Sequence, residues 1–175
     1  MAYDELCKGR WSLQQQVYHV TTATQDREPL FADFGRGRRV VRQLMALERQ
    51  GRVVTLCFVV MPDHLHWLLS LQQGSLSDAV RLLKGRAARE VGRPLWQPGF
   101  HDHALRRDEE LVRVARYIVA NPLRAGLVQR IGDYPLWDSV WLPAEHGLSG
   151  GWADVRPTKT ECRPTESGFT GSSSR

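Results

Sequence analysis

Two apolar runs of strand length, separated by a Pro-Asp pair, restrict the fold of this chain more than any other feature. Val53–Met61 (VVTLCFVVM) is rich in β-branched residues, which favours a strand buried on both faces over a short helix. Pro62-Asp63 breaks the run, and His64–Leu71 (HLHWLLSL) has the composition of a second strand. The sequence therefore predicts a pair of strands in the middle of a sheet.

Other strands and helices alternate on either side of this pair. Further strands are expected at Val17–Ala23 and at Leu95–Leu105, which Pro98-Gly99 interrupts, and helices at Arg36–Gln50, Ser77–Val91 and Glu109–Asn121. Ser75 or Ser77 would cap the second helix. Asp108 would cap the third helix, which Pro122 would end or kink. The order β-α-β-β-α-β-α predicts an α+β fold with helices packed on a mostly antiparallel sheet.

The composition of the chain changes near its C-terminal end. A length of 175 residues suits one domain with a buried core. From about Pro143 onward, Gly, Ser, Thr and Pro dominate and apolar anchors become scarce. We therefore expect residues 1–142 to form the domain and residues 143–175 to form a flexible tail.

The formal net charge of +5 favours a polyanionic partner, either nucleic acid or an anionic membrane surface. No apolar stretch approaches the ~18 residues that a membrane helix requires, and the N-terminus lacks a signal-peptide pattern. Cys7, Cys57 and Cys162 lie far apart without metal-binding spacing, as expected of reduced thiols. Together these features predict a cytoplasmic protein that does not enter a membrane.

His64-Leu65-His66 is the strongest chemical signal in the sequence. Side chains two residues apart on a strand point to the same face, so both imidazoles project together while Leu65 enters the core. Two neighbouring imidazoles form half of a divalent-metal site, and the alternative is a half-exposed pair hydrogen-bonded to water. His101 and His103 have the same spacing, so all four histidines could instead hold a structural zinc. Their location on two predicted strands, without a supporting cysteine, counts against zinc.

The last predicted helix carries a row of polar side chains at spacings of four, four and three residues: Arg113, Tyr117, Asn121 and Arg124. Residues at these spacings are neighbours on a helix surface, so Tyr117 and Asn121 can face the same site. The alternative for Tyr117 is a packing role at the border of an apolar stripe, with its hydroxyl in water.

Two groups of basic residues could contact phosphates. The first lies at the start of a predicted helix and contains Arg36, Arg38, Arg39 and Arg42. The second lies on or just after the next helix and contains Arg81, Lys84, Arg86, Arg89 and Arg93. Guanidinium groups and helix N-termini both bind phosphate, whereas the alternative for each group is a solvated helix face.

Three segments together resemble one known family. They are VVMPDHLHWLLSL (Val59–Leu71), WQPGFHDHALR (Trp96–Arg106) and VARYIVANPLRAGLV (Val114–Val128). In this order and spacing they are similar to the REP-associated tyrosine transposases, relatives of the single-tyrosine insertion-sequence transposases in the HUH endonuclease superfamily. The similarity runs from about Trp11 to Trp141. It implies a ferredoxin-like or RRM-like antiparallel sheet with helices packed on it.

The resemblance also implies roles for individual residues. His64 and His66 match the metal histidines, Tyr117 matches the nucleophile, and Asn121 matches a third ligand of Mg²⁺ or Mn²⁺. Tyr117 would attack a DNA phosphate and form a 5′-phosphotyrosine bond that releases a 3′-OH, which can later reverse the step. Metal-bound water or a nearby histidine such as His103 would take the tyrosine proton.

The partner that the resemblance implies is a palindromic REP hairpin with a short single-stranded foot, contacted by the arginines at positions 36, 38, 39, 42 and 124 and by Lys84 and Arg86. A bacterial, nucleoid-associated location and a monomer are favoured, with a dimer as the alternative. Three rival functions remain open at this point. They are a hairpin-binding protein that does not cut, a replication-initiator or relaxase-like nuclease, and the structural-zinc protein.

Overall fold

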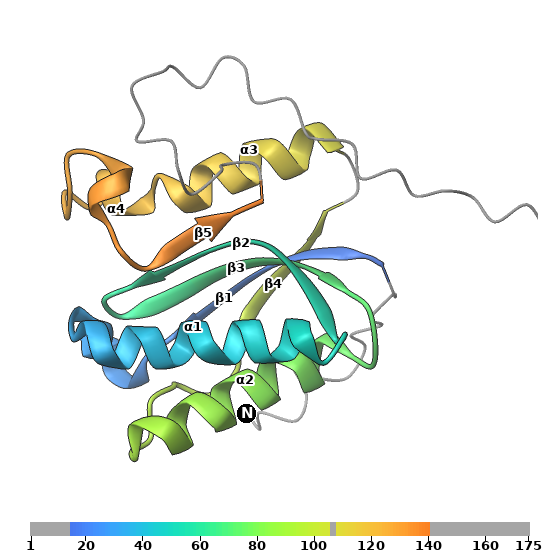
Figure 1. Cartoon of the computed structure of the whole chain (residues 1–175), viewed down its shortest axis with the longest axis horizontal. Helices are drawn as coiled ribbons and strands as arrows, with labels where there is room; N and C mark the ends of the chain where they lie inside the picture. The colour runs from blue at the N-terminus through green and yellow to red at the C-terminus, as the bar shows by residue number, and fades with distance from the viewer. Residues whose placement is uncertain (1–14, 106–107, 141–175) are drawn as a thin grey trace, which may run out of the picture.

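A five-stranded antiparallel sheet organises the part of the chain that the computed structural model describes, residues 15–105 and 108–140. The strands stand in the order β4-β1-β3-β2-β5, so β3 is central (Figure 1). Their bounds are Val17–Ala23 for β1, Val53–Met61 for β2, His64–Leu71 for β3, His101–Leu105 for β4 and Trp137–Ser139 for β5. The predicted strand pair is confirmed, since β2 and β3 pair antiparallel from Val53 opposite Leu71 to Met61 opposite His64.

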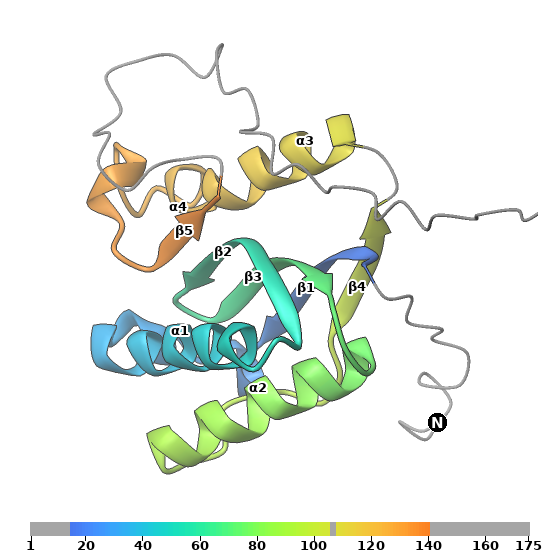
Figure 2. The ribbon, with the colours of Figure 1, turned by 45° about the vertical axis from the view of Figure 1, so that its right-hand side comes forward.

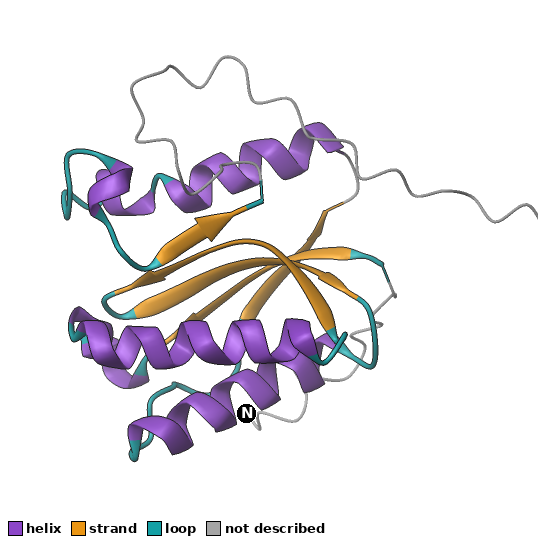
Figure 3. Cartoon of the chain, viewed as in Figure 1, coloured by secondary structure: helices purple, strands orange, loops and turns teal. Residues whose placement is uncertain are grey.

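Helices cover both faces of the sheet (Figure 3). On one face lie α1 (Phe34–Arg49) and α2 (Leu76–Val91), and on the other lie α3 (Asp108–Val119) and the short α4 (Asn121–Arg124). The view turned by 45° separates the two layers clearly (Figure 2). Apart from two short 3-10 turns, the chain from β1 to β4 runs β-α-β-β-α-β, the arrangement of a ferredoxin-like fold, so the predicted α+β class is confirmed.

Alternation along β3 assigns its side chains to the two layers. Leu65, Trp67 and Leu69 are fully buried against α1 and α2. Leu68 points the other way and packs with Ile118 of α3. Because successive strand residues alternate between faces, His64 and His66 must also lie on the α3 side.

Local signals explain the helix boundaries on the α1–α2 side. The side chain of Asp33 accepts a hydrogen bond from the backbone N–H of Arg36, so α1 begins two residues before its predicted start at Arg36. Ser75 caps α2 by accepting from the backbone N–H of Asp78 at 3.1 Å, which decides between the two predicted caps. Gly92 ends α2 in a left-handed conformation.

The predicted strand Leu95–Leu105 is wrong in its first half. Regular pairing begins only at His101, and before it Trp96 makes a single bridge to Thr24. Pro98 has no backbone N–H to donate, and Gly99 has a φ of 75°, so this segment turns instead of extending.

Lys84 of α2, which was predicted to contact DNA, holds this irregular segment by two hydrogen bonds. Its ammonium donates to the carbonyls of Gln97 and Gly99, each at 2.7 Å. Burial lowers the pKa of Lys84 to about 8. The ammonium group of Lys84 therefore holds the segment that leads into β4.

Two further differences concern the end of the fold. The helix predicted for Glu109–Asn121 ends at Val119, and Pro122 lies in the first turn of the separate short helix α4, as expected of a residue that ends or kinks a helix. Strand β5 was not predicted, because three residues are too few for a periodic pattern. The predicted tail, residues 143–175, lies outside the described residues. Among the helices that the structure describes, none has an apolar stretch of membrane-spanning length.

Candidate active site

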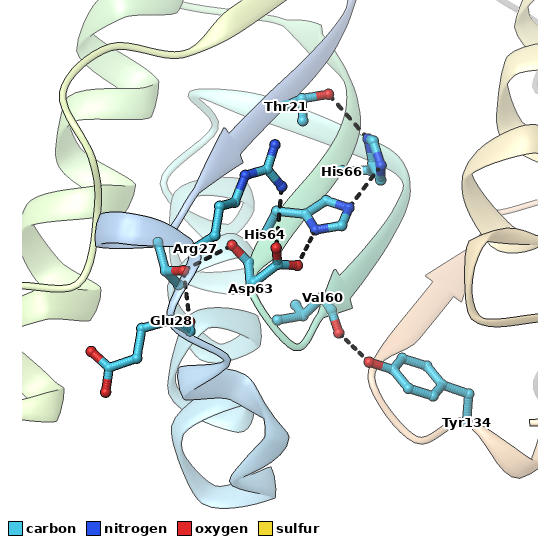
Figure 4. Close-up of polar contacts among 9 residues, drawn as sticks. Thr21, Arg27, Glu28, Val60, Asp63, His64, His66 and Tyr134 are labelled. Carbon is cyan, nitrogen blue, oxygen red and sulfur yellow. Dashed lines mark hydrogen bonds and ion pairs between the residues drawn. The ribbon is translucent and has the colours of Figure 1, made fainter. Parts of the chain in front are cut away.

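His64 and His66 project from β3 toward α3 with their rings side by side (Figure 4). Their Nε2 atoms lie 3.2 Å apart, and the rings meet edge to face with centroids 4.8 Å apart. An octahedral ion with ligands at about 2.1 Å keeps neighbouring ligand atoms about 3 Å apart. The spacing and the chemistry of the two imidazoles therefore fit a divalent metal ion.

The environment of His66 keeps its imidazole neutral. The side chain is only 8% exposed, and burial, followed by the charges of His64, His19 and Arg27, lowers its pKa to about 3. A neutral imidazole keeps a lone pair available for a metal ion at physiological pH.

Both histidines have hydrogen-bond partners on the ring nitrogen that faces away from the pair. Asp63 Oδ1 lies 2.5 Å from Nδ1 of His64. The hydroxyl of Thr21 lies 3.0 Å from Nδ1 of His66, and Nε2 of His19 lies 3.2 Å from the same atom. Sequence reasoning missed these three supporting residues, although the alternation in VYHVTTA places His19 and Thr21 on one face of β1.

Tyr117 lies on α3, the helix that packs over the sheet face carrying the two histidines. Buried neighbours on α3, Ala115 and Ile118, fix the helix against the sheet. The Tyr117 side chain is 44% exposed, and its ring centroid lies 6.2 Å from that of His66. The guanidinium of Arg124 lies 4.8 Å from the centre of the Tyr117 ring, so two members of the predicted row of polar side chains are in contact.

The other tyrosines in the described part of the chain are held in structural positions. Tyr134 donates its hydroxyl to the carbonyl of Val60 at 2.7 Å, and burial raises its pKa to about 12 (Figure 4). Tyr18 is buried in the core between the sheet and the α1–α2 layer. Tyr117 combines exposure with closeness to the histidines, as a nucleophile requires.

Asn121, the first residue of α4, follows Tyr117 by four residues, and its side chain is turned toward the end of α3. Its Nδ2 donates to the carbonyls of Tyr117 at 3.0 Å and Ile118 at 3.2 Å. These contacts close the end of α3 and leave Oδ1 as the atom that could bind a metal. The role of Asn121 as a third ligand stays a prediction.

The second histidine pair does not join the first. His101 and His103 lie on β4, which β1 separates from β3, and His103 stands opposite His19. In residues 15–105 and 108–140, no group of three or more His, Cys, Asp or Glu side chains is arranged to hold a metal ion. The four-histidine zinc site therefore has no support, and the role of His103 in proton transfer stays a prediction.

Most of the predicted DNA-contacting residues lie on the side of the sheet away from the histidines. They are on α1 and α2: Arg36, Arg38, Arg39, Arg42, Lys84 and Arg86. Two of these arginines also join the helices, since Arg39 donates to the carbonyl of Glu90 at 2.7 Å and Arg42 pairs with its carboxylate at 3.2 Å. The basic residues thus form two areas, one on the α1–α2 layer and one at Arg124 beside Tyr117.

Comparisons with known proteins agree with the resemblance seen in the sequence. The chain is 32% identical over 81 residues to a REP-associated tyrosine transposase from Escherichia coli, covering 45% of this chain and 49%, about half, of that relative. It is 31% identical over 110 residues to the ISDra2 transposase TnpA from Deinococcus radiodurans, covering 55% of this chain and 77% of the relative.

A solved structure of a REP-associated tyrosine transposase bound to a REP hairpin has the same fold, with a TM-score of 0.66 and 23% identity over 73% of this chain and 79% of that one. The family model described as IS200-like transposase matches residues 12–121, more than half of the chain. This protein therefore belongs to the IS200-like transposase family.

Proposed function

We propose that this protein is a metal-dependent transposase that binds palindromic REP hairpins and cleaves and rejoins single-stranded DNA through Tyr117. Family membership supports the class of reaction, and the solved structure that shares this fold is bound to a REP hairpin, which suggests the same kind of partner here. The observation that carries the proposal is the distance of 6.2 Å between the ring centroids of Tyr117 and His66, whose Nε2 atom lies 3.2 Å from that of His64. A nucleophile and two metal ligands thus meet in one place.

The reaction follows from the chemistry of these groups. His64 and His66, with Asn121 as the third ligand, would hold Mg²⁺ or Mn²⁺, and the ion would supply Lewis-acid chemistry at the scissile phosphate. The Tyr117 hydroxyl oxygen attacks the phosphorus in line, and the bond from phosphorus to the 3′ oxygen breaks. The 5′ phosphate becomes linked to Tyr117, and the released 3′ oxygen gains a proton to become a 3′-OH. Attack of a 3′-OH on the phosphotyrosine reverses the step without ATP.

Arg124 assists this chemistry by its position. Its guanidinium lies 4.8 Å from the centre of the Tyr117 ring. A fixed cation there stabilises the negative charge that develops on the tyrosine oxygen and on the phosphate. The proton from Tyr117 passes to water or to a histidine on the same face, with His103 as the candidate.

The protein surface offers two areas for contact with DNA. The single-stranded segment lies against Tyr117 and Arg124, whereas the arginines of α1 are available to phosphates of the hairpin stem on the other layer. All parts of the proposed site come from one chain, so we expect a monomer to be active. Sedimentation of the active protein at assay concentration tests this expectation.

The decisive experiment uses labelled single-stranded DNA that carries the REP hairpins of the source genome. The protein is incubated with it in Mn²⁺ or Mg²⁺, and products are separated on a denaturing protein gel. Label should stay on the wild-type protein, and on the matched control Tyr134→Phe, but not on Tyr117→Phe or in EDTA. Tight hairpin binding without an adduct in any metal would instead support a hairpin-binding protein that does not cut.

A further inference from the structure

An acidic side chain connects His64 to an arginine outside the proposed metal site. Asp63 Oδ1 lies 2.5 Å from Nδ1 of His64, and Asp63 Oδ2 lies 3.2 Å from Nη1 of Arg27 (Figure 4). Because Asp63 is paired with the guanidinium of Arg27, it is a carboxylate that can only accept hydrogen bonds.

The backbone around Asp63 is fixed by the loop that follows β1. The carbonyl of Asp63 accepts from the backbone N–H of Thr24 at 2.8 Å and from its hydroxyl at 2.9 Å. The carbonyl of Pro62 accepts from the backbone N–H of Phe31 at 2.8 Å. These three bonds hold the turn between β2 and β3, so the carboxylate has little freedom to swing away from His64.

The same loop holds Arg27 in an uncommon conformation. Asp26 and Arg27 have φ angles of 52° and 56°, a left-handed region that side chains other than glycine rarely adopt. Such strain persists only where the surrounding structure compensates for it, and it is frequent at functional sites. Here the strained residue places its guanidinium on the carboxylate next to His64.

We propose that Asp63, held by Arg27, is a positioning residue that fixes the tautomer of His64. A carboxylate at Nδ1 requires a hydrogen on that nitrogen, and the lone pair then lies on Nε2, which faces His66 at 3.2 Å. Histidines that bind metal ions usually donate their other ring N–H to a carboxylate or carbonyl in this way. This inference rests on the proposed metal site, but the tautomer itself can be measured without metal or DNA.

The first measurement records the ¹⁵N chemical shifts of the histidine rings in metal-free protein, with His64→Gln used to assign the signals. We expect hydrogen on Nδ1 of His64 in the wild type and a shift of the population toward Nε2–H in Asp63→Ala. Asp133→Asn is the control, because it breaks an exposed pair with Arg130 that contacts no metal-site histidine. Hydrogen on Nε2 of His64 in the wild type would overturn the inference.

The second measurement is the affinity for Mn²⁺ by calorimetric titration. Asp63→Ala should weaken binding about 10- to 100-fold, the usual effect of losing such a partner, whereas Asp133→Asn should not. Arg27→Gln should weaken it less, and the double variant should be no weaker than Asp63→Ala alone, because Arg27 acts through Asp63. Wild-type affinity in Asp63→Ala would overturn the positioning role only. A wild-type protein with the expected tautomer but no Mn²⁺ binding would overturn the proposed metal site and leave the tautomer inference standing.

Discussion

The ring of Tyr117 meets the ring of His66 nearly at right angles, with their centroids 6.2 Å apart and an interplanar angle of 76°. The first residue comes from α3 and the second from β3, so the packing of α3 on the sheet sets the distance between them. In the proposed reaction this distance decides how closely the nucleophile approaches a phosphate held at the histidines.

Replacement of Arg124 by Gln should slow formation of the covalent adduct by about 2- to 5-fold, the effect expected from losing a cation beside an exposed aromatic ring. The guanidinium lies 4.8 Å from the centre of the Tyr117 ring and is exposed, so folding should not suffer. Single-turnover adduct formation at saturating DNA measures the effect. Arg130→Gln, another exposed arginine far along the chain from Tyr117, is the control, and equal rates in the two variants would contradict the role of Arg124.

Acid should destabilise the metal-free protein through His66. The pKa of His66 is near 6.5 in the unfolded chain and about 3 in the folded one. Between these values the unfolded chain binds a proton that the native state does not, so the free energy of unfolding falls as the pH falls. This contribution is fully present above about pH 6.5, declines by at most about 1.4 kcal/mol per pH unit, and is completely lost near pH 3.

Urea unfolding in EDTA, between pH 7 and pH 5, measures this dependence. His66→Asn removes the titrating group, so its free energy of unfolding should fall less over this range than that of the wild type. Groups that do not interact with His66 titrate equally in both proteins and cancel in the comparison. Parallel curves for the wild type and the variant would show that His66 is not held neutral by the fold.

The order of strands and helices could be predicted because it depends on local patterns. The apolar run Val53–Met61, the break at Pro62 and the alternation after it are properties of neighbouring residues, and the structure confirms the strand pair that they indicated. Strand β5 could not be predicted in this way. It exists because Trp137–Ser139 meets the edge of β2 at Cys57–Val59, a pairing between segments far apart in the chain.

The sequence predicted the parts of the site that lie on a single strand or helix, because only there do the residues follow a regular spacing. The spacing of His64 and His66 placed both imidazoles on one face of β3, and the structure agrees. One ring partner, Asp63, is the residue before His64, but Thr21 comes from β1, and Arg27, which holds Asp63, comes from the loop after β1. No local rule connects Thr21 to His66, 45 residues later, or Arg27 to Asp63, 36 residues later. For the same reason, the attachment of Lys84 to the segment before β4 could not be seen in the sequence.

Arg38→Gln should weaken hairpin binding and reduce the salt dependence of the affinity. Arg38 is exposed on α1, on the layer opposite the histidines, so a lost phosphate contact should lower the slope of log K against log salt by about 1. Fluorescence anisotropy over a range of salt concentrations gives this slope. Binding of Mn²⁺ should not change, and a wild-type slope in Arg38→Gln would remove this residue from the DNA surface.

Two adjacent threonines of β1, Thr21 and Thr22, allow a test of whether hydrogen bonds orient the His66 ring. Thr21 places its hydroxyl 3.0 Å from Nδ1 of His66, whereas the hydroxyl of Thr22 is buried on the other face and has no hydrogen-bond partner in the described part of the chain. A hydroxyl can donate or accept, so Thr21 satisfies Nδ1 whether or not that nitrogen carries the hydrogen. When His66 binds a metal through Nε2, the hydrogen must lie on Nδ1, and Thr21 is then its acceptor.

Substitution by valine keeps the shape and the strand preference of either threonine and removes only the hydroxyl. Thr21→Val should therefore weaken Mn²⁺ binding by about 10-fold, the lower end of the usual effect, because His19 remains 3.2 Å from the same nitrogen. Thr22→Val should leave Mn²⁺ affinity unchanged and should not lower the free energy of unfolding, because it replaces an unsatisfied buried polar atom with a methyl group. Equal Mn²⁺ affinities in the two variants would show that the hydroxyl of Thr21 does not orient His66, and would leave His19 as the group that does.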